Sequence, residues 1–169
     1  MTPDEKDQLP YRPCVGIVLF DAGGRVFIAQ RLDTKEAAWQ LPQGGIDEGE
    51  EPKQAALREL EEEIGTANVD ILGESRKWLS YDLPPDLVGE AWRGLYRGQT
   101  QKWFAMLFLG QNSEISPSSV AHPEFSDWKW AAFEEIPGCA VDFKKSVYQA
   151  LVDEFRDIAF KLKYFGQGD

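Results

Sequence analysis

Residues 52–64 (PKQAALRELEEEI) form the segment that most constrains how this chain can fold. The segment contains no glycine and consists mostly of residues with strong helix propensity. Pro52 suits the first turn of a helix, and Gly65 suits the position just after the last turn. The sequence therefore predicts a helix over residues 52–64, and the rest of the chain must provide a surface for its apolar side.

Three glutamates share one side of this helix. At about 100° per residue, Glu59, Glu62 and Glu63 fall in one arc, because they are related as i, i+3 and i+4. Glu61 points elsewhere, and the adjacent arc carries an apolar stripe made of Ala56, Leu57, Leu60 and Ile64. Acidic residues in the last turn oppose the helix dipole and repel one another, with only Arg58 nearby to compensate. A bound divalent cation would offset both effects, whereas the plainer alternative is a solvated acidic face.

The residue types in the chain limit which metal such a cluster could hold. The only histidine is His122, and Cys14 and Cys139 lie far apart in the sequence, so a cysteine and histidine zinc site is not expected. Oxygen ligands favour Mg²⁺, Mn²⁺ or Ca²⁺. The first ten residues contain no export signal, so we expect both cysteines to be free thiols and the protein to be cytoplasmic.

The net charge of −11 bears on the possible partners. A surface that coats DNA or long RNA relies on many Lys and Arg contacts to phosphates, so no DNA partner is expected. One nucleotide end could still be recognised, because a few cations can gather locally and a metal can reverse the sign of a carboxylate site. No apolar run approaches the roughly 18 residues that span a membrane, so no membrane partner is expected.

Other segments alternate between strand and helix patterns. Apolar runs over residues 15–20 and 25–31, separated by a glycine turn, predict a β-hairpin. Residues 83–98 form a long connection that contains Pro, Gly and Trp. Further strands are predicted over residues 39–42, 77–82, 102–109 and 127–133, and an amphipathic helix over residues 141–162. These patterns predict a single α/β domain flanked by two tails: residues 11–162, 1–10 and 163–169.

The glycine turn, the acidic loop and the helix together resemble the signature of the Nudix family. That signature is Gly, five residues, Glu, seven residues, Arg-Glu-apolar, one residue, Glu-Glu, one residue, Gly-apolar. The match covers residues 44–66, with Thr66 as the one departure, and its positions are Gly44, Glu50, Arg58, Glu59, Leu60, Glu62, Glu63 and Gly65. The resemblance implies an α/β/α sandwich with a mixed sheet between helices, and hydrolysis of nucleoside diphosphates linked to another moiety.

The same resemblance assigns roles to the residues of this box. Glu59, Glu62 and Glu63 would be ligands of Mg²⁺ or Mn²⁺, and the carbonyl of Gly44 or Gly45 is a further candidate ligand. Glu50 and Arg58 would pair and hold the loop against the helix. Each role is an expectation from the family and not from the spacing alone.

Outside the box, the chain resembles the bacterial RNA pyrophosphohydrolases and the related dinucleoside polyphosphate hydrolases within this family. The matching segments are residues 11–13, 15–16, 39–45, 101–104, 123–125 and 143–144. The resemblance implies that Glu124 is an additional metal ligand or a base. It also suggests cations for the phosphates, an aromatic ring for a base and an amide near the substrate: Arg12, Arg31, Lys144, Phe143 and Gln43. The plainer alternatives are surface cations, a loop carboxylate and a core phenylalanine.

Three functions remain open for the chain. The leading hypothesis is removal of pyrophosphate from the 5′ end of triphosphorylated RNA, with Glu62 or Glu124 accepting the proton of the attacking water. The second is cleavage of diadenosine polyphosphates. The third, from another class, is a non-catalytic module that binds a nucleotide or an RNA end. An acidic Ca²⁺-binding interaction protein is disfavoured because no EF-hand spacing is present. We expect a monomer.

Overall fold

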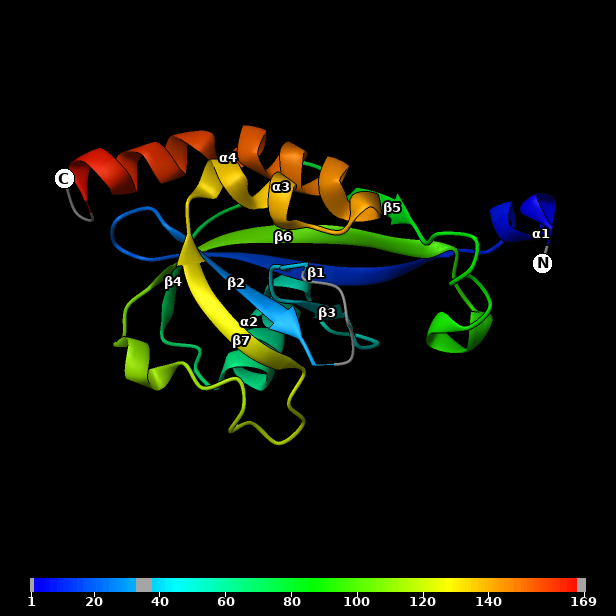
Figure 1. The fold of residues 1–169 in the computed structure, drawn as a ribbon, viewed down its shortest axis with the longest axis horizontal. Coiled ribbons are helices and arrows are strands. Elements are labelled where there is room, and N and C mark those ends of the chain that lie inside the picture. The colour runs from blue at the N-terminus through cyan, green and yellow to red at the C-terminus, as the bar shows by residue number, and fades with distance from the viewer. Residues whose placement is uncertain (1, 33–37, 167–169) are drawn as a thin grey trace.

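The computed structural model describes residues 2–32 and 38–166. Figure 1 shows a central sheet with the long helix α4 along one face and the helix α2 below the other. The helices are α1 (Pro3–Asp7), α2 (Pro52–Ile64), α3 (Ile136–Cys139) and α4 (Lys145–Phe165). The strands are β1 (Tyr11–Phe20), β2 (Val26–Arg31), β3 (Gln43–Gly45), β4 (Val69–Glu74), β5 (Leu79–Asp82), β6 (Gly98–Phe108) and β7 (Phe125–Ala131).

The sheet is built on one long parallel pair. β1 and β6 run side by side from Tyr11↔Gly98 to Phe20↔Leu107, and the strand order is β4-β6-β1-β2-β7. β5 pairs with β6, and β3 pairs with β1, both antiparallel. The sheet is therefore mixed, and its central strand β1 is buried from Cys14 to Phe20 because both of its faces are covered.

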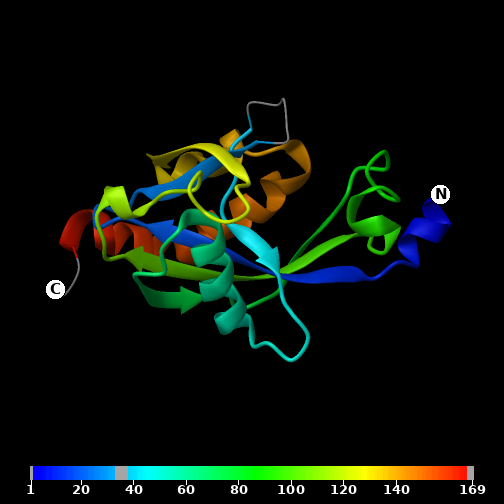
Figure 2. The ribbon, with the colours of Figure 1, turned by 90° about the horizontal axis from the view of Figure 1, so that it is seen from below.

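Two separate cores lie on the two faces of the sheet. Val18 and Phe20 of β1 point into the core under α4, while Ile17 and Leu19 point into the core above α2. This alternation follows from the two-residue period of a strand. Figure 2, turned by 90°, views the sheet from the side of α2, which lies in front of the strands while α4 lies behind them. The expected α/β/α sandwich is confirmed, and so is the expected apolar stripe of α2, of which Leu60 is fully buried.

The two strands of the expected hairpin, β1 and β2, separate after their first pair, and the site begins in the gap between them. They pair at Phe20↔Val26, and further along the segment 40–45 lies between them. Gln40 bridges Ala29 of β2, and β3 pairs with Cys14–Gly16 of β1. The predicted strand at residues 39–42 is wrong in its bounds, since the strand covers Gln43–Gly45. Proline has no N–H, so Pro42 only accepts, from the Ile17 N–H at 2.9 Å, and regular pairing starts one residue later.

Several other boundaries differ from the sequence prediction. β4 was not predicted, because its short pattern of half-buried and exposed residues carries little apolar signal. α1 lies inside the expected N-terminal tail, and α4 continues to Phe165, into the expected C-terminal tail. α4 also starts later than expected, because residues 142–144 form a 3₁₀ turn. β7 ends at Ala131, since Phe133 begins another such turn.

No helix within residues 2–32 and 38–166 has both the length and the apolar character needed to cross a membrane.

The contact between Gly16 and Trp103 gives a test of the parallel pair. The two residues are register partners, and a Cβ at Gly16 would collide with the fully buried Trp103 ring. We expect Gly16→Ala to lower the free energy of unfolding by about 1–3 kcal/mol, as overpacked cores do. Gly23→Ala is the matched control, because a Cβ there meets only an Asp21 oxygen at 3.6 Å. Urea unfolding measures both, and equal stability of the two variants would contradict the prediction.

Candidate functional site

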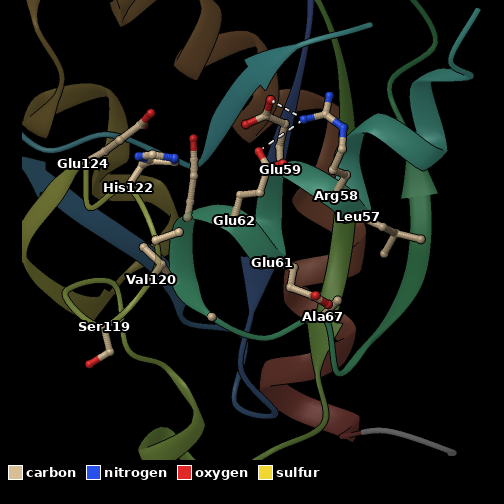
Figure 3. A pocket seen from close by; sticks show the side chains of 13 residues that line it. Leu57, Arg58, Glu59, Glu61, Glu62, Ala67, Ser119, Val120, His122 and Glu124 are labelled. Atoms are coloured by element: carbon tan, nitrogen blue, oxygen red, sulfur yellow. Dashed lines mark hydrogen bonds and ion pairs between the residues drawn. The ribbon is translucent and has the colours of Figure 1, made fainter.

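Arg58 of α2 connects the glycine turn, the acidic loop and two of the helix glutamates. Its Nε and Nη2 donate to both oxygens of Glu50 at 2.8 Å, and Nη2 also donates to the Gly45 carbonyl at 2.9 Å. Nη1 donates to Glu59 at 3.0 Å and to Glu62 at 3.2 Å. Figure 3 shows the last two contacts as dashed lines. One guanidinium thus holds loop and helix together.

Charge-assisted hydrogen bonds shift the titration of this pair. The Arg58 guanidinium, followed by the Asp47 N–H, lowers the pKa of Glu50 to about 2. The Glu50 carboxylate in turn raises the pKa of Arg58. Both groups therefore stay charged throughout the physiological pH range.

Gly44 brings the turn into direct contact with the helix. A Cβ at this position would collide with the carboxylate of Glu59, so any other residue would displace either that carboxylate or the strand β3. The glycine of the box is thus required here for close approach. The Gly44 carbonyl belongs to the strand β3, which passes beside Glu59.

The three glutamates differ in burial. The side chain of Glu62 is 59% exposed, that of Glu59 is 15% exposed, and Glu63 is only 3% exposed. Burial raises the pKa of Glu59, and it raises the pKa of Glu63 further. The Oε2 atom of Glu63 has no hydrogen-bond partner in the structure. An unpartnered buried carboxylate oxygen is costly unless a cation or a proton compensates it.

Glu124 faces the same side of α2 from another part of the chain. Its backbone carbonyl accepts from the Leu32 N–H at 2.8 Å, which attaches its loop to the end of β2. The negative charge of Glu124 adds to the raised pKa of Glu63 and of Glu59. The structure thus places Glu124 on a loop that faces the helix α2 across the pocket.

A pocket of about 940 Å³ lies between α2 and the loop that carries Glu124. In Figure 3, His122 and Glu124 project from that loop toward the helix, while Glu61 points away from the other glutamates. The side chain of His122 is exposed. The residues that line the pocket include Glu59, Glu62, Glu63, Glu124, His122 and Val120.

The donor set fits a hard divalent cation. All the candidate donors are oxygens, one of them is the unpartnered Glu63 Oε2, and the Gly44 backbone lies against Glu59. Within residues 2–32 and 38–166, no three Asp, Glu, His or Cys side chains already converge as a metal site. Glu59 and Glu62 are both bound to Arg58 instead. A metal ion would therefore compete with Arg58 for these two carboxylates.

Two cations, Lys144 and Arg31, interact electrostatically with Glu63. Lys144, in the turn before α4, is buried, and burial followed by the charge of Arg31 lowers the pKa of Lys144 to about 8. The negative charge of Glu63 acts in the opposite direction on Lys144, and Arg31 lowers the pKa of Glu63. Lys144, Arg31 and Glu63 are therefore neighbours. The Lys144 Nζ also lies 5.8 Å from the centre of the Tyr81 ring.

Arg12 of β1 belongs to the same cationic group. Its Nη1 lies 3.4 Å from the sulfur of the buried Cys14, and its guanidinium lies against the backbone of Gly45. Cys14 and Cys139 are both free thiols, as predicted. Burial raises the pKa of Cys14 to about 11, so the thiol is neutral beside the guanidinium.

A buried polar network supports Gln43, and the sequence analysis did not anticipate it. The Gln101 amide donates to Gln43 and to Gln99 at 3.0 Å each, and the Tyr81 hydroxyl donates to Gln99 at 2.8 Å. Gln99 and Gln101 are almost fully buried. The signal was the pair of amides at alternate positions of β6, because such positions share one face of the strand.

Phe143 is half-buried beside this network. Its ring centre lies 5.5 Å from that of Tyr81, and it packs against the core under α4. One side of the ring is therefore used for packing. Stacking of a base on Phe143 stays a prediction.

Comparisons with known proteins agree with this geometry. The family model described as NUDIX domain matches residues 10–151. A protein named RNA pyrophosphohydrolase from Dinoroseobacter shibae is 49% identical over 93% of this chain and 99% of its own. One of the same name from Novosphingobium aromaticivorans is 52% identical over 89% and 95%. The fold is similar to that of the E. coli dihydroneopterin triphosphate pyrophosphohydrolase, with a TM-score of 0.65, 20% identity, and 88% and 99% coverage.

The buried Glu63 predicts how stability depends on pH when no metal is bound. Because its pKa is raised well above the ordinary value of 4.5, the folded state binds more protons than the unfolded state once the pH exceeds that value. The free energy of unfolding should then fall as the pH rises toward the folded pKa. Glu63→Gln cannot ionise, so we expect it to gain stability over the wild type between about pH 5 and pH 8.

Urea unfolding in chelator at both pH values measures this gain. Glu61→Gln is the control, because Glu61 lies on the same helix turn but is exposed. If the difference between Glu63→Gln and the wild type did not change with pH, Glu63 would not be the titrating group.

Proposed function

Because the chain belongs to the Nudix family, we propose that it is a metal-dependent RNA 5′-pyrophosphohydrolase, which converts 5′-triphosphate ends to 5′-monophosphate ends and releases pyrophosphate. One structural observation carries the proposal: Glu63 lies where an acidic face meets a group of cations. A triphosphate with its metal needs both kinds of surface side by side. The relatives named RNA pyrophosphohydrolase support RNA as the bearer of that triphosphate.

The metal would be Mg²⁺ or Mn²⁺, held by Glu59, Glu62 and Glu63, with Glu124 and the Gly44 carbonyl as further ligands. When bound, such an ion neutralises phosphate charge and lowers the pKa of a water molecule. The Arg58–Glu50 pair would keep the helix and the glycine turn in place during the reaction, since both groups stay ionised. The unpartnered Oε2 of Glu63 supports this ligand set.

The cations would bind the phosphate groups other than the one that the water attacks. Within the described residues, Arg12 and Lys144 form no ion pair with a carboxylate, so their charge is available to an anion. The lowered pKa of Lys144, about 8, still leaves it mostly protonated at neutral pH. A phosphate brought beside Lys144 would favour its charged form further. Arg31 would act next to it.

Proton transfer would fall to a carboxylate that water can reach. Glu62 and Glu124 are both exposed and both line the pocket. Either could accept the proton of the attacking water, and Glu63 is less suited because it is buried. Two free thiols and an RNA substrate also fit a cytoplasmic enzyme.

Pyrophosphate release tests the proposal directly. With triphosphorylated RNA and Mg²⁺, we expect Glu59→Gln to lower kcat at least about 100-fold, because it removes a metal ligand. Glu61→Gln should stay close to the wild type, since Glu61 points away from the cluster. Full activity after exhaustive chelation would contradict the metal dependence, and the absence of any pyrophosphate release would favour a non-catalytic binding module.

Substrate choice gives a second test. Diadenosine tetraphosphate has one nucleoside at each end of its phosphate bridge, whereas a triphosphorylated RNA offers a second base on the same side of its phosphates. Stacking of one base on an aromatic ring contributes about 1–3 kcal/mol. We expect kcat/KM for triphosphorylated RNA to exceed that for diadenosine tetraphosphate by about tenfold. Phe143→Ala should reduce this preference, whereas Arg12→Ala should weaken both substrates alike. A higher kcat/KM for the dinucleotide would make the chain a dinucleoside polyphosphate hydrolase instead.

A further inference from the structure

The connection between β5 and β6 contains the only non-glycine residues with positive φ among residues 2–32 and 38–166. They are consecutive: Trp92 has φ 49° and ψ 40°, and Arg93 has φ 59° and ψ 24°. The left-handed region is unfavourable for residues with a side chain, above all for a large aromatic. Such a conformation persists only where the surrounding structure holds it, and it often marks a functional position.

The connection is firmly attached at its base. The Leu83 N–H donates to the Arg97 carbonyl at 2.8 Å, and Arg97 binds both oxygens of Asp82. Figures 1 and 2 show the loop beside α1, at the far end of the two long strands. Trp92 packs against the core under α4 and meets the Tyr96 ring edge-to-face at 6.3 Å. The turn that contains Trp92 and Arg93 is therefore anchored to the rest of the domain.

The turn brings Trp92 onto Arg12. The Arg12 guanidinium carbon lies 5.4 Å from the centre of the indole ring, within the range of a cation–π contact. Its other contacts are the Gly45 backbone and the Cys14 sulfur. No carboxylate in the described part of the chain pairs with Arg12. The guanidinium is thus held by neutral groups, which fix its position and leave its charge uncompensated.

We propose that Trp92 is a positioning residue for Arg12. The indole holds the guanidinium against Gly45, which follows the glycine that contacts Glu59. The positive charge of Arg12 is therefore already in place to bind a phosphate chain at the glutamates. The proposal deepens the proposed function, because it explains how one phosphate contact is fixed. Preorganisation of this kind improves binding by reducing the side-chain freedom that is lost when the ligand binds.

A double-mutant cycle tests whether Trp92 acts through Arg12. The probe is inorganic tripolyphosphate with Mg²⁺, and its Kd is measured by calorimetry for the wild type, Trp92→Ala, Arg12→Ala and the double variant. We expect Trp92→Ala to weaken binding about three- to fivefold and Arg12→Ala to weaken it more. The double variant should bind no more weakly than Arg12→Ala alone, because the indole would have nothing left to position.

Two further variants distinguish positioning from a structural role. Trp92→Phe keeps an aromatic face and should restore most of the lost affinity, while Arg93→Ala, in the same turn but away from Arg12, should bind as the wild type does. If Trp92→Ala weakened binding equally in the Arg12→Ala background, the proposal would be overturned. The same holds if the wild type did not bind tripolyphosphate, or if Trp92→Ala impaired only triphosphorylated RNA, which would mean that Trp92 stacks on a base.

The binding assay does not depend on the reaction. Tripolyphosphate contains no nucleoside, so its Kd reports on Arg12 and Trp92 whether or not the protein cleaves RNA. Pyrophosphate release from triphosphorylated RNA by the wild type is measured separately and tests the proposed function alone.

Discussion

The geometry of the site depends on one guanidinium. Arg58 binds the acidic loop through Glu50, the glycine turn through the Gly45 carbonyl, and its own helix through Glu59 and Glu62. Bidentate, charge-assisted bonds of this kind fix direction as well as distance. Because Arg58 is the common partner, the turn, the loop and the helix glutamates form one rigid unit. The rest of the fold presents this unit at the gap where β1 and β2 separate.

A second constraint is the unfavourable burial of the Glu63 carboxylate close to other negative charges. The side chain is buried on a helix that already carries three other glutamates, and Glu124 adds negative charge from outside the helix. Lys144 and Arg31 offset part of this charge, and Lys144 is itself disfavoured by its burial. A buried acid and a buried base that both resist ionisation are typical of a site made for a charged ligand. The two apolar cores of the sandwich stabilise the fold and so offset the energetic cost of this site.

The helix 52–64, the sandwich and the acidic face could be predicted from the sequence, because Pro52, Gly65 and the spacing of the glutamates act locally. The burial of Glu63 could not, since its neighbours Gln43, Arg31 and Lys144 are distant from it in sequence. The strand at Gln43–Gly45 was misplaced because glycines usually end strands, and here Gly44 is needed for its contact with Glu59. The Gln43–Gln101 hydrogen bond and the Trp92–Arg12 contact were missed, because both join residues that are distant in sequence.

The parallel pairing of β1 with β6 has a consequence for synthesis. Residues 11–20 pair along their whole length only with residues 98–107, so the centre of the sheet closes late on a chain made from its N-terminus. Until β6 leaves the ribosome, α2 has no completed sheet to pack on, and the glutamates and the cations cannot be brought together. A nascent chain therefore carries all the residues of the acidic face well before it can assemble a working site.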